Sequence, residues 1–480
     1  MPFTSLLKRE VKNVSVYTTA TFSTSLLSFL LLPLYWKKLT PTDYGIIAIA
    51  EMLGSFSSPF LTLFLDQSLT RFYYEWNEVD RKRKIGGIWV LSWLNIICVG
   101  GISIFLLSRI SPYFFPEVDF YPYLFLGLTA QLLGSFDAIT FATIRIKNMP
   151  KFYTGYSLLK TSLLLGSSIL FVLILDWGLY GYFVAQIISS GIIAIMALGI
   201  MFYFATPAIR NTGIREALKY SLPLIPNKMV TIVGSFIDRY MLQQFASVEA
   251  LGIYAVSMKF ANLMSTLHSA LKLAYGPFLY QKLHEKDGKQ IIAKMTLLYV
   301  FPLFFTALSI SVYIDEFVKW INQPAYFQVV KYVPYVVLIA LMETMKNYYT
   351  PGIVLAKKTH LLLVPSLVCT AISIVGSIIF VPLYQTEGVI IVRFIESFVS
   401  FMILMVLSLR VYEMIYSWRG FLGFWGIMLV CLLIHQWISI EGLLISTLFS
   451  TGLLILFVLA SFLNIRAGQK HLNALYLKTN

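Results

Sequence analysis

Apolar runs of about 20 residues recur along the whole chain and are separated by short segments that hold most of the charged residues. Such a run is just long enough to cross the hydrocarbon core of a bilayer as an α-helix. In lipid the backbone satisfies its hydrogen bonds only within a helix or a closed barrel, and the alternating pattern of barrel strands is absent. Hydrophobic residues make up 58% of the 480 positions and charged residues 12%, which excludes an ordinary soluble fold. The sequence therefore predicts an all-α integral membrane protein.

Fourteen membrane-spanning helices are predicted from the apolar runs between charge clusters. The first run is too long for the core of a signal peptide and lacks a cleavage site, so we expect it to remain as the first membrane helix. The predicted spans are residues 14–36, 44–64, 86–108, 121–143, 154–175, 178–204, 223–245, 252–274, 291–314, 326–345, 361–383, 387–409, 420–438 and 441–464.

Positive charge is distributed unevenly between the two sides of this topology. Of 37 lysines and arginines, only Lys37, Lys38, Arg109 and Lys319 fall in outer loops, whereas most lie in the alternate loops and the two tails. Because positively charged loops remain in the cytoplasm, both termini are predicted to be cytoplasmic. This bias accounts for the net charge of +14 without a nucleic-acid partner, and the basic run 81–84 is expected to meet anionic membrane lipid.

The sequence contains no pattern that is typical of an enzyme or an ATP-driven pump. No loop is long enough for a soluble catalytic domain, and no phosphate-binding glycine motif is present. The three cysteines lie within apolar runs and give neither a disulfide framework nor metal-ligand spacing. His268 and His435 are isolated on apolar helices. We therefore predict no catalytic residue, no cofactor and no metal site.

The sequence contains a weak internal repeat. Its two segments lie at the start of the second and the eighth predicted spans, which would be the second helix of each half of the chain. TPTDYGIIAIA at 40–50 is similar to SVEALGIYAVS at 247–257, at an offset of 207 residues or six spans. An even number of spans keeps both halves in the same orientation, so their symmetry axis would run along the membrane normal. The predicted domains are an N-terminal six-helix bundle (1–210), a C-terminal six-helix bundle (211–415), and two additional helices with a cytoplasmic tail (416–480).

Several short segments, taken in order, resemble the O-antigen flippase group. This group is the polysaccharide-transporter branch of the multidrug, oligosaccharidyl-lipid and polysaccharide exporter superfamily, whose multidrug branch is the MATE transporters. The resemblance covers most of the chain. It is carried by LPLYWKKLTPTDYG (32–45), DQSLTRFYYE (66–75), YSLPLIP (220–226), DRYML (238–242) and LGIY (251–254).

The resemblance implies a MATE-like fold and a function in polysaccharide and lipopolysaccharide biosynthesis. The expected activity is translocation of an undecaprenyl-diphosphate-linked oligosaccharide from the cytoplasmic to the periplasmic leaflet of the bacterial inner membrane. A polysaccharide polymerase complex is an expected partner beside the lipid-linked glycan.

Polar side chains within the spans are the candidate binding residues, because a charge at mid-bilayer must face protein or water. One helical face of the seventh span carries Lys228, Thr231, Ser235 and Arg239. One face of the eighth span carries Lys259, Asn262 and Thr266. Cations and hydroxyls in this pattern favour binding of a diphosphate-linked sugar. The simpler interpretation is that Lys228 and Arg239 lie near helix ends and reach toward water, with Asp238 neutralising its neighbour.

Other ionisable residues in the spans are candidates for ion coupling or for structural ion pairs. Glu51 shares a face with Ser55 and Ser58 and could exchange protons, or pair with a facing lysine. The remaining candidates are the cross-helix pair Asp137 and Lys160 and the within-helix pair Arg393 and Glu396.

The sequence is also compatible with two other functions. A multidrug antiporter on the same scaffold would prefer carboxylates to the lysines and arginine of spans seven and eight. A membrane polysaccharide polymerase would need a larger outer loop than this chain has.

Overall fold

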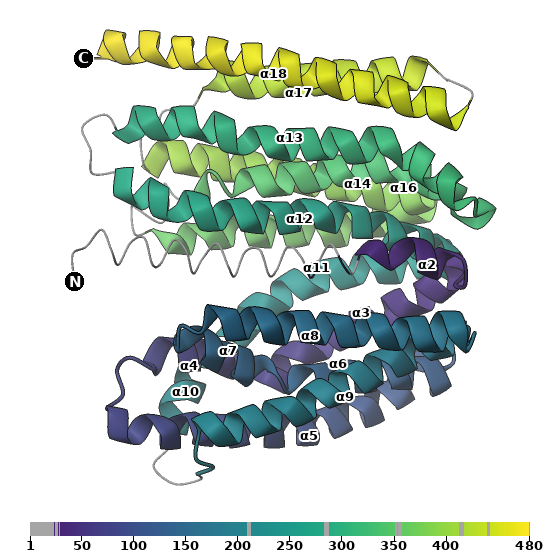
Figure 1. The fold of residues 1–480 in the computed structure, drawn as a ribbon, viewed down its shortest axis with the longest axis vertical. Coiled ribbons are helices and arrows are strands. Elements are labelled where there is room, and N and C mark those ends of the chain that lie inside the picture. The colour runs from purple at the N-terminus through teal and green to yellow at the C-terminus, as the bar shows by residue number, and fades with distance from the viewer. Residues whose placement is uncertain are drawn as a thin grey trace. The chain divides into compact units, whose positions relative to one another are not determined.

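The computed structural model describes residues 24, 27, 29–208, 213–282, 288–350, 353, 358–411, 417–438 and 442–479. Within these ranges the chain forms helices and turns, and no β-strand. The helices divide into two compact units. Unit 1 comprises residues 1–252 and 373–389, and unit 2 comprises residues 253–372 and 390–480. Within each unit the long helices run alongside one another (Figure 1).

Unit 1 contains the helices of the first half of the chain and two that follow. α3 begins with a capping box in which Thr40 and Asp43 exchange hydrogen bonds, and Pro41 occupies its first turn. It ends where Leu63 and Phe64 adopt left-handed backbone conformations, which turn the chain into α4. The elements are α2 (Leu32–Trp36), α3 (Pro41–Thr62), α4 (Leu65–Phe72), α5 (Glu78–Phe114), η1 (Phe120–Leu124), α6 (Phe125–Ser135), α7 (Ala138–Ile146), α8 (Pro150–Ser168), η2 (Ile169–Ile174), α9 (Gly178–Phe204), α10 (Ile214–Ser221) and α11 (Leu224–Phe245).

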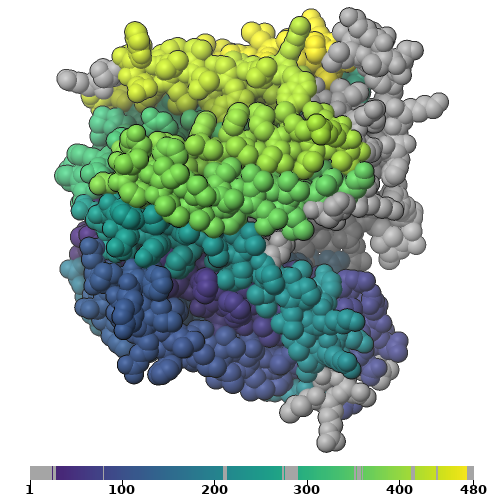
Figure 2. Space-filling model, turned by 180° about the vertical axis from the view of Figure 1, so that it is seen from behind, coloured from purple at the N-terminus to yellow at the C-terminus, as the bar shows by residue number. Residues whose placement is uncertain are grey.

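Unit 2 contains most of the remaining helices. Its elements are α12 (Val248–Lys282), α13 (Gly288–Ile321), η3 (Pro324–Tyr326), α14 (Phe327–Lys346), η4 (Thr359–Leu362), α16 (Leu363–Val411), α17 (Trp418–Trp437) and α18 (Leu443–Thr479). The first turn of α12 and the segment 373–389 of α16 belong to unit 1. α13 packs against α14, α17 and α18. The outer faces of α17 and α18, yellow to yellow-green in Figure 2, expose large apolar side chains such as Leu422, Leu444 and Leu448. Such faces are typical of contact with lipid.

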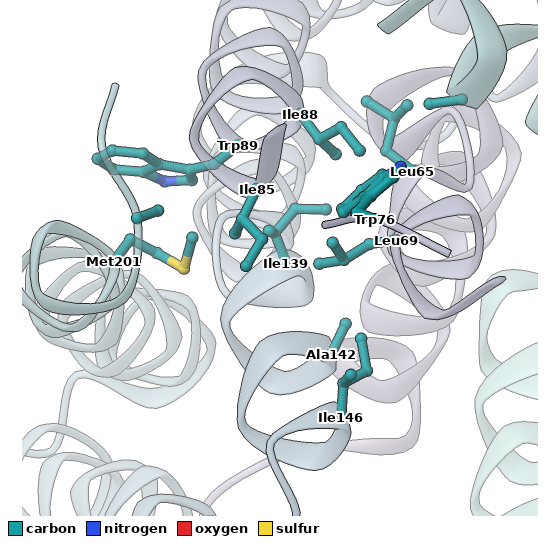
Figure 3. Close-up of a cluster of buried hydrophobic side chains, with 12 residues drawn as sticks. Leu65, Leu69, Trp76, Ile85, Ile88, Trp89, Ile139, Ala142, Ile146 and Met201 are labelled. Carbon is teal, nitrogen blue, oxygen red and sulfur yellow. The ribbon is translucent and has the colours of Figure 1, made fainter. Parts of the chain in front are cut away.

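A buried apolar cluster joins five elements at one end of unit 1 (Figure 3). α5 supplies Ile85, Ile88 and Trp89, and the loop before it supplies Trp76. These side chains pack against residues of α4, α7, α9 and α10, among them Leu65, Leu69, Ile139, Ala142, Ile146 and Met201. The ends of these helices are therefore fixed relative to one another.

The fourteen-helix all-α fold predicted from the apolar runs is confirmed. Ten helices of the described residues are long and apolar enough to cross a membrane. One of them, α16, contains two predicted spans, because its backbone breaks at Gln385. α11 and α12 also coincide with predicted spans, but their polar stripes lower their hydropathy. Most of the first span, 14–36, lies outside the described residues.

The two units do not follow the boundaries predicted at 210 and 415. α10 packs on α4 and α11 packs on α3, so these two helices belong to unit 1, whereas α17 and α18 belong to unit 2. The division of the chain into two symmetric bundles and an appended pair therefore stays a prediction.

The repeated segments meet each other through their glycines. A Cβ atom on Gly45 of α3 would lie 2.0 Å from the carbonyl oxygen of Val248, and one on Gly252 would lie 1.7 Å from that of Pro41. All four residues belong to unit 1. The offset of 207 relates Pro41 to Val248 and Gly45 to Gly252. In each repeat the glycine therefore contacts the same position of the other repeat: Gly45 contacts Val248, and Gly252 contacts Pro41. A two-fold axis between the repeated segments would produce reciprocal contacts of this kind, and that symmetry stays a prediction.

Candidate functional site

The polar stripe predicted on the seventh span lies along the accessible side of α11. Lys228 and Thr231 are exposed, and Ser235 and Arg239 are partly exposed. The packed side of the helix carries Gly234 and Met241, which are both buried. The stripe therefore presents two cations and two hydroxyls on one uncovered face of unit 1.

An aromatic cluster accompanies this stripe. The ring of Phe236 lies 5.9 Å from that of Phe56 on α3 and 6.3 Å from that of Tyr240, with the second pair nearly parallel. Tyr240 in turn contacts Phe114, at the end of α5, at 5.6 Å. Phe56 and Phe114 remain about two-fifths exposed, at 38% and 42%. Flat apolar rings beside hydroxyls and cations suit a ligand with both sugar rings and charge.

α3 contributes a carboxylate to the same face. Glu51 and Ser55 are both exposed. Because α3 and α11 run in opposite directions in the predicted topology, Glu51 and Arg239 both lie on the outer side of the contact between Phe56 and Phe236. Glu51 lies about 8 Å along α3 from Phe56, and Arg239 lies about 5 Å along α11 from Phe236. The face thus places Arg239 and one carboxylate at similar depth, whereas Lys228, eight residues before Phe236, lies about 12 Å to the inner side.

The stripe predicted on the eighth span lies in unit 2. Lys259 is partly buried and Asn262 is exposed, while the hydroxyl of Thr266 donates to the backbone carbonyl of Asn262. The stripe leaves the amide of Asn262 accessible.

Asp238 has partners that the sequence did not reveal. Its side chain is 1% exposed, and its Oδ1 accepts hydrogen bonds from Ser377 at 2.8 Å and Ser373 at 3.1 Å. Ser373 also donates to the carbonyl of Gly234. Two serines four residues apart on α16 therefore hold this carboxylate on the packed side of α11, away from the accessible stripe.

Both ion pairs predicted from the sequence form in the structure. Lys160 on α8 donates to Asp137, the residue before α7, at 2.5 Å, and Asp137 is 5% exposed. Arg393 donates to Glu396 one turn later on α16 at 2.9 Å. Each carboxylate thus has a cationic partner within its own unit.

A further buried carboxylate was missed because the sequence placed it in an outer loop. α13 continues to Ile321, beyond the predicted end at 314, so Glu316 lies inside the helix and is 5% exposed. Its Oε1 accepts hydrogen bonds from Ser446 at 2.5 Å and Ser450 at 2.8 Å on α18. Asp238 and Glu316 are thus each bound by two serines that are four residues apart in an apolar run. We call each such arrangement a carboxylate clamp, and the serine spacing is visible in the sequence.

Comparison with known families identifies the chain. The family model described as "Polysaccharide biosynthesis protein" matches residues 11–281, more than half of the length. The chain belongs to this family. It is also 22% identical over 289 residues to "Lsg locus putative protein 1" of Haemophilus influenzae, covering 57% of this chain and 67% of that protein.

Solved structures with similar folds are membrane transporters of the MOP superfamily. "Lipid II flippase MurJ, inward closed conformation" has a TM-score of 0.68 at 14% identity, covering 92% of this chain and 97% of that one. The MATE multidrug transporter DinF-BH has a TM-score of 0.55 at 15% identity, covering 85% of this chain and 96% of that one. At these identities the similarity establishes the fold, which is the MATE-like fold predicted from the sequence.

Proposed function

We propose that this polysaccharide biosynthesis family member is a flippase that moves a polyprenyl-diphosphate-linked oligosaccharide across the bacterial inner membrane. The observation that carries the proposal is the accessible face of α3 and α11, which combines cations, hydroxyls and aromatic rings at membrane depth. A flippase needs all three, because its cargo has a diphosphate and a glycan that must both leave water.

Each residue type on this face has a distinct part. Lys228 and Arg239, with Lys259 of unit 2, replace water around the diphosphate, and the planar guanidinium of Arg239 can bind two of its oxygens at once. Ser235 and Asn262 hydrogen-bond the glycan hydroxyls. Phe56, Phe236 and Tyr240 offer ring faces for the apolar sides of the sugars.

Transport proceeds by alternating access, with the glycan held by the protein and the polyprenyl tail in lipid. Glu51 is the carboxylate placed to exchange ions with water, because it is exposed on the same face as the cations. Asp238 is a second coupling candidate, although its two serine donors favour a structural role. The pairs of Asp137 with Lys160 and of Arg393 with Glu396 stabilise helix packing.

The setting of the protein follows from its charge distribution. We place both termini in the cytoplasm because the alternate loops and tails hold most of the lysines and arginines. A polysaccharide polymerase complex in the same membrane is the expected recipient of the flipped glycan. The protein acts as a transporter and not as an enzyme.

The test neutralises one cation in each unit. The double variant Arg239→Gln and Lys259→Gln should lose surface polysaccharide and accumulate lipid-linked oligosaccharide in the cytoplasmic leaflet, measured by mass spectrometry and leaflet-specific labelling. The matched control, Arg109→Gln with Arg466→Gln, also removes one cation from each unit but leaves the stripes intact, and it should export normally.

The other outcomes separate the competing functions. Normal export by a correctly inserted double variant would remove these cations from the site. An unchanged oligosaccharide pool with altered drug tolerance after gene deletion would identify an antiporter, and accumulation of single repeat units on the outer face would identify a polymerase.

A further inference from the structure

One end of unit 1 carries a rigid basic surface that lies outside the proposed transport face. The buried cluster of Figure 3 fixes α4, α5, α7, α9 and α10 at this end. The backbone N–H of Thr206 also donates to the carbonyl of Lys82 at 3.1 Å, which joins the end of α9 to the start of α5. The basic side chains here therefore rest on fixed backbone. In the predicted topology this end faces the cytoplasm.

Lys147 lies at this end of unit 1, directly after α7. Its ammonium group lies 5.0 Å from the centre of the Phe204 ring, a cation–π contact with the end of α9. Burial lowers the pKa of Lys147, and the neighbouring charges of Lys82 and Arg81 lower it further. Three cations are thus close enough to repel one another.

The neighbouring Arg81 is engaged by a carboxylate and by two backbone carbonyls. Arg81 pairs with Glu78 at 3.6 Å, and its guanidinium also donates to the carbonyls of Tyr73 and Trp76. Among the residues that the structure describes, neither Lys82 nor Lys147 forms an ion pair. The ammonium group of Lys147 is therefore near enough to that of Lys82 to feel its charge, and neither pairs with a carboxylate of the described residues.

We propose that Lys82 and Lys147, backed by the Phe204 ring, form a binding site for the phosphate of a lipid head group on the inner face of unit 1. An anion between two ammonium groups relieves their repulsion, and a phosphate offers several strong acceptor oxygens. The setting suits a lipid because Phe202 and Tyr203, next to Phe204, are 58% and 78% exposed, and exposed aromatic rings are typical of the membrane interface. The site lies apart from the stripe of α11 that is proposed to bind the cargo.

Native mass spectrometry of the detergent-solubilised full chain tests this site. The probes are phosphatidylglycerol, a polyprenyl diphosphate and, as a zwitterionic reference, phosphatidylcholine. The double variant Lys82→Gln with Lys147→Gln should bind the anionic probe roughly thirtyfold more weakly, since each cation near a membrane surface contributes about 1 kcal/mol. The double variant Lys82→Arg with Lys147→Arg keeps both charges and should retain binding.

The matched control removes two exposed cations from the inner face of unit 2, Arg419 and Lys470. This control should bind both anionic lipids as the unaltered protein does. A selective loss for phosphatidylglycerol identifies a bilayer lipid as the ligand, and a selective loss for the polyprenyl diphosphate identifies the transport carrier. Equal binding by the Lys82→Gln, Lys147→Gln variant and the unaltered protein would overturn the proposal, whatever the outcome of the export test.

Discussion

Removing one partner of the ion pair between Asp137 and Lys160 tests how much a single unpaired charge lowers the stability of unit 1. Asp137 is 5% exposed, whereas the side chain of Lys160 is 38% exposed. Asp137→Ala leaves the lysine without its partner. We expect a loss of about 2 kcal/mol in the free energy of unfolding, less than for a fully buried pair because water screens the exposed lysine.

A double-mutant cycle in detergent micelles measures this effect by titration with SDS. Asp137→Ala combined with Lys160→Met removes both charges, so it should recover most of the lost stability. Equal stability of the single and double variants would show that the pair contributes packing and no charge compensation.

Residues close in sequence were predicted better than residues that meet across the fold. Arg393 and Glu396 are one helical turn apart, so their pairing follows from helix geometry alone. Asp238 instead meets Ser373 and Ser377, more than 130 positions later. No local pattern predicts this contact, and the sequence suggested the adjacent Arg239 as the partner of Asp238.

At the scale of elements, the reciprocal glycine contact between α3 and the first turn of α12 makes a sharp prediction. A methyl group on Gly252 would overlap the backbone of Pro41, which cannot rotate away as a side chain can. Gly252→Ala and Gly45→Ala should each lower the free energy of unfolding by about 1–3 kcal/mol, the usual effect of overpacking. Titration with SDS measures it.

Gly101 on α5 provides the matched control for these variants. Apart from its chain neighbours and the backbone of its own helix, no atom lies within 4 Å of a Cβ atom built there. Gly101→Ala should therefore be neutral or stabilise by up to about 1 kcal/mol through helix propensity. If all three alanine variants behaved alike, the close crossing would not exist in the folded protein.

At the scale of the whole molecule, the spans were predictable because the bilayer sets helix length. The thirteen predicted spans after the first coincide with helices in the described residues, and their ends agree within about eight residues except at α18, which continues to Thr479, well beyond the predicted end at 464. The error at Glu316 has the same origin. A charged residue near the end of an apolar run suggests a loop, whereas hydrogen bonds from two serines of α18 let Glu316 lie inside the helix.

The C-terminal helices test how polar and apolar contacts differ in a membrane. Removal of residues 417–480 would take from α13 both the ring contacts of Phe301 and Phe304 and the serines that bind Glu316. Lipid can replace the apolar contacts, because its tails are as apolar as the lost side chains. It cannot replace hydroxyl donors to a carboxylate.

We therefore expect the truncated chain to be destabilised by up to about 3 kcal/mol, the cost of a charge facing hydrocarbon, chiefly through Glu316. Glu316→Leu in the truncated chain should restore most of the yield of folded protein and the resistance to SDS. Asp315→Leu, which removes the neighbouring acid that pairs with Lys319 at 2.6 Å, should not. Failure of Glu316→Leu to rescue would mean that apolar packing on α13, and not the clamped carboxylate, makes the last two helices necessary.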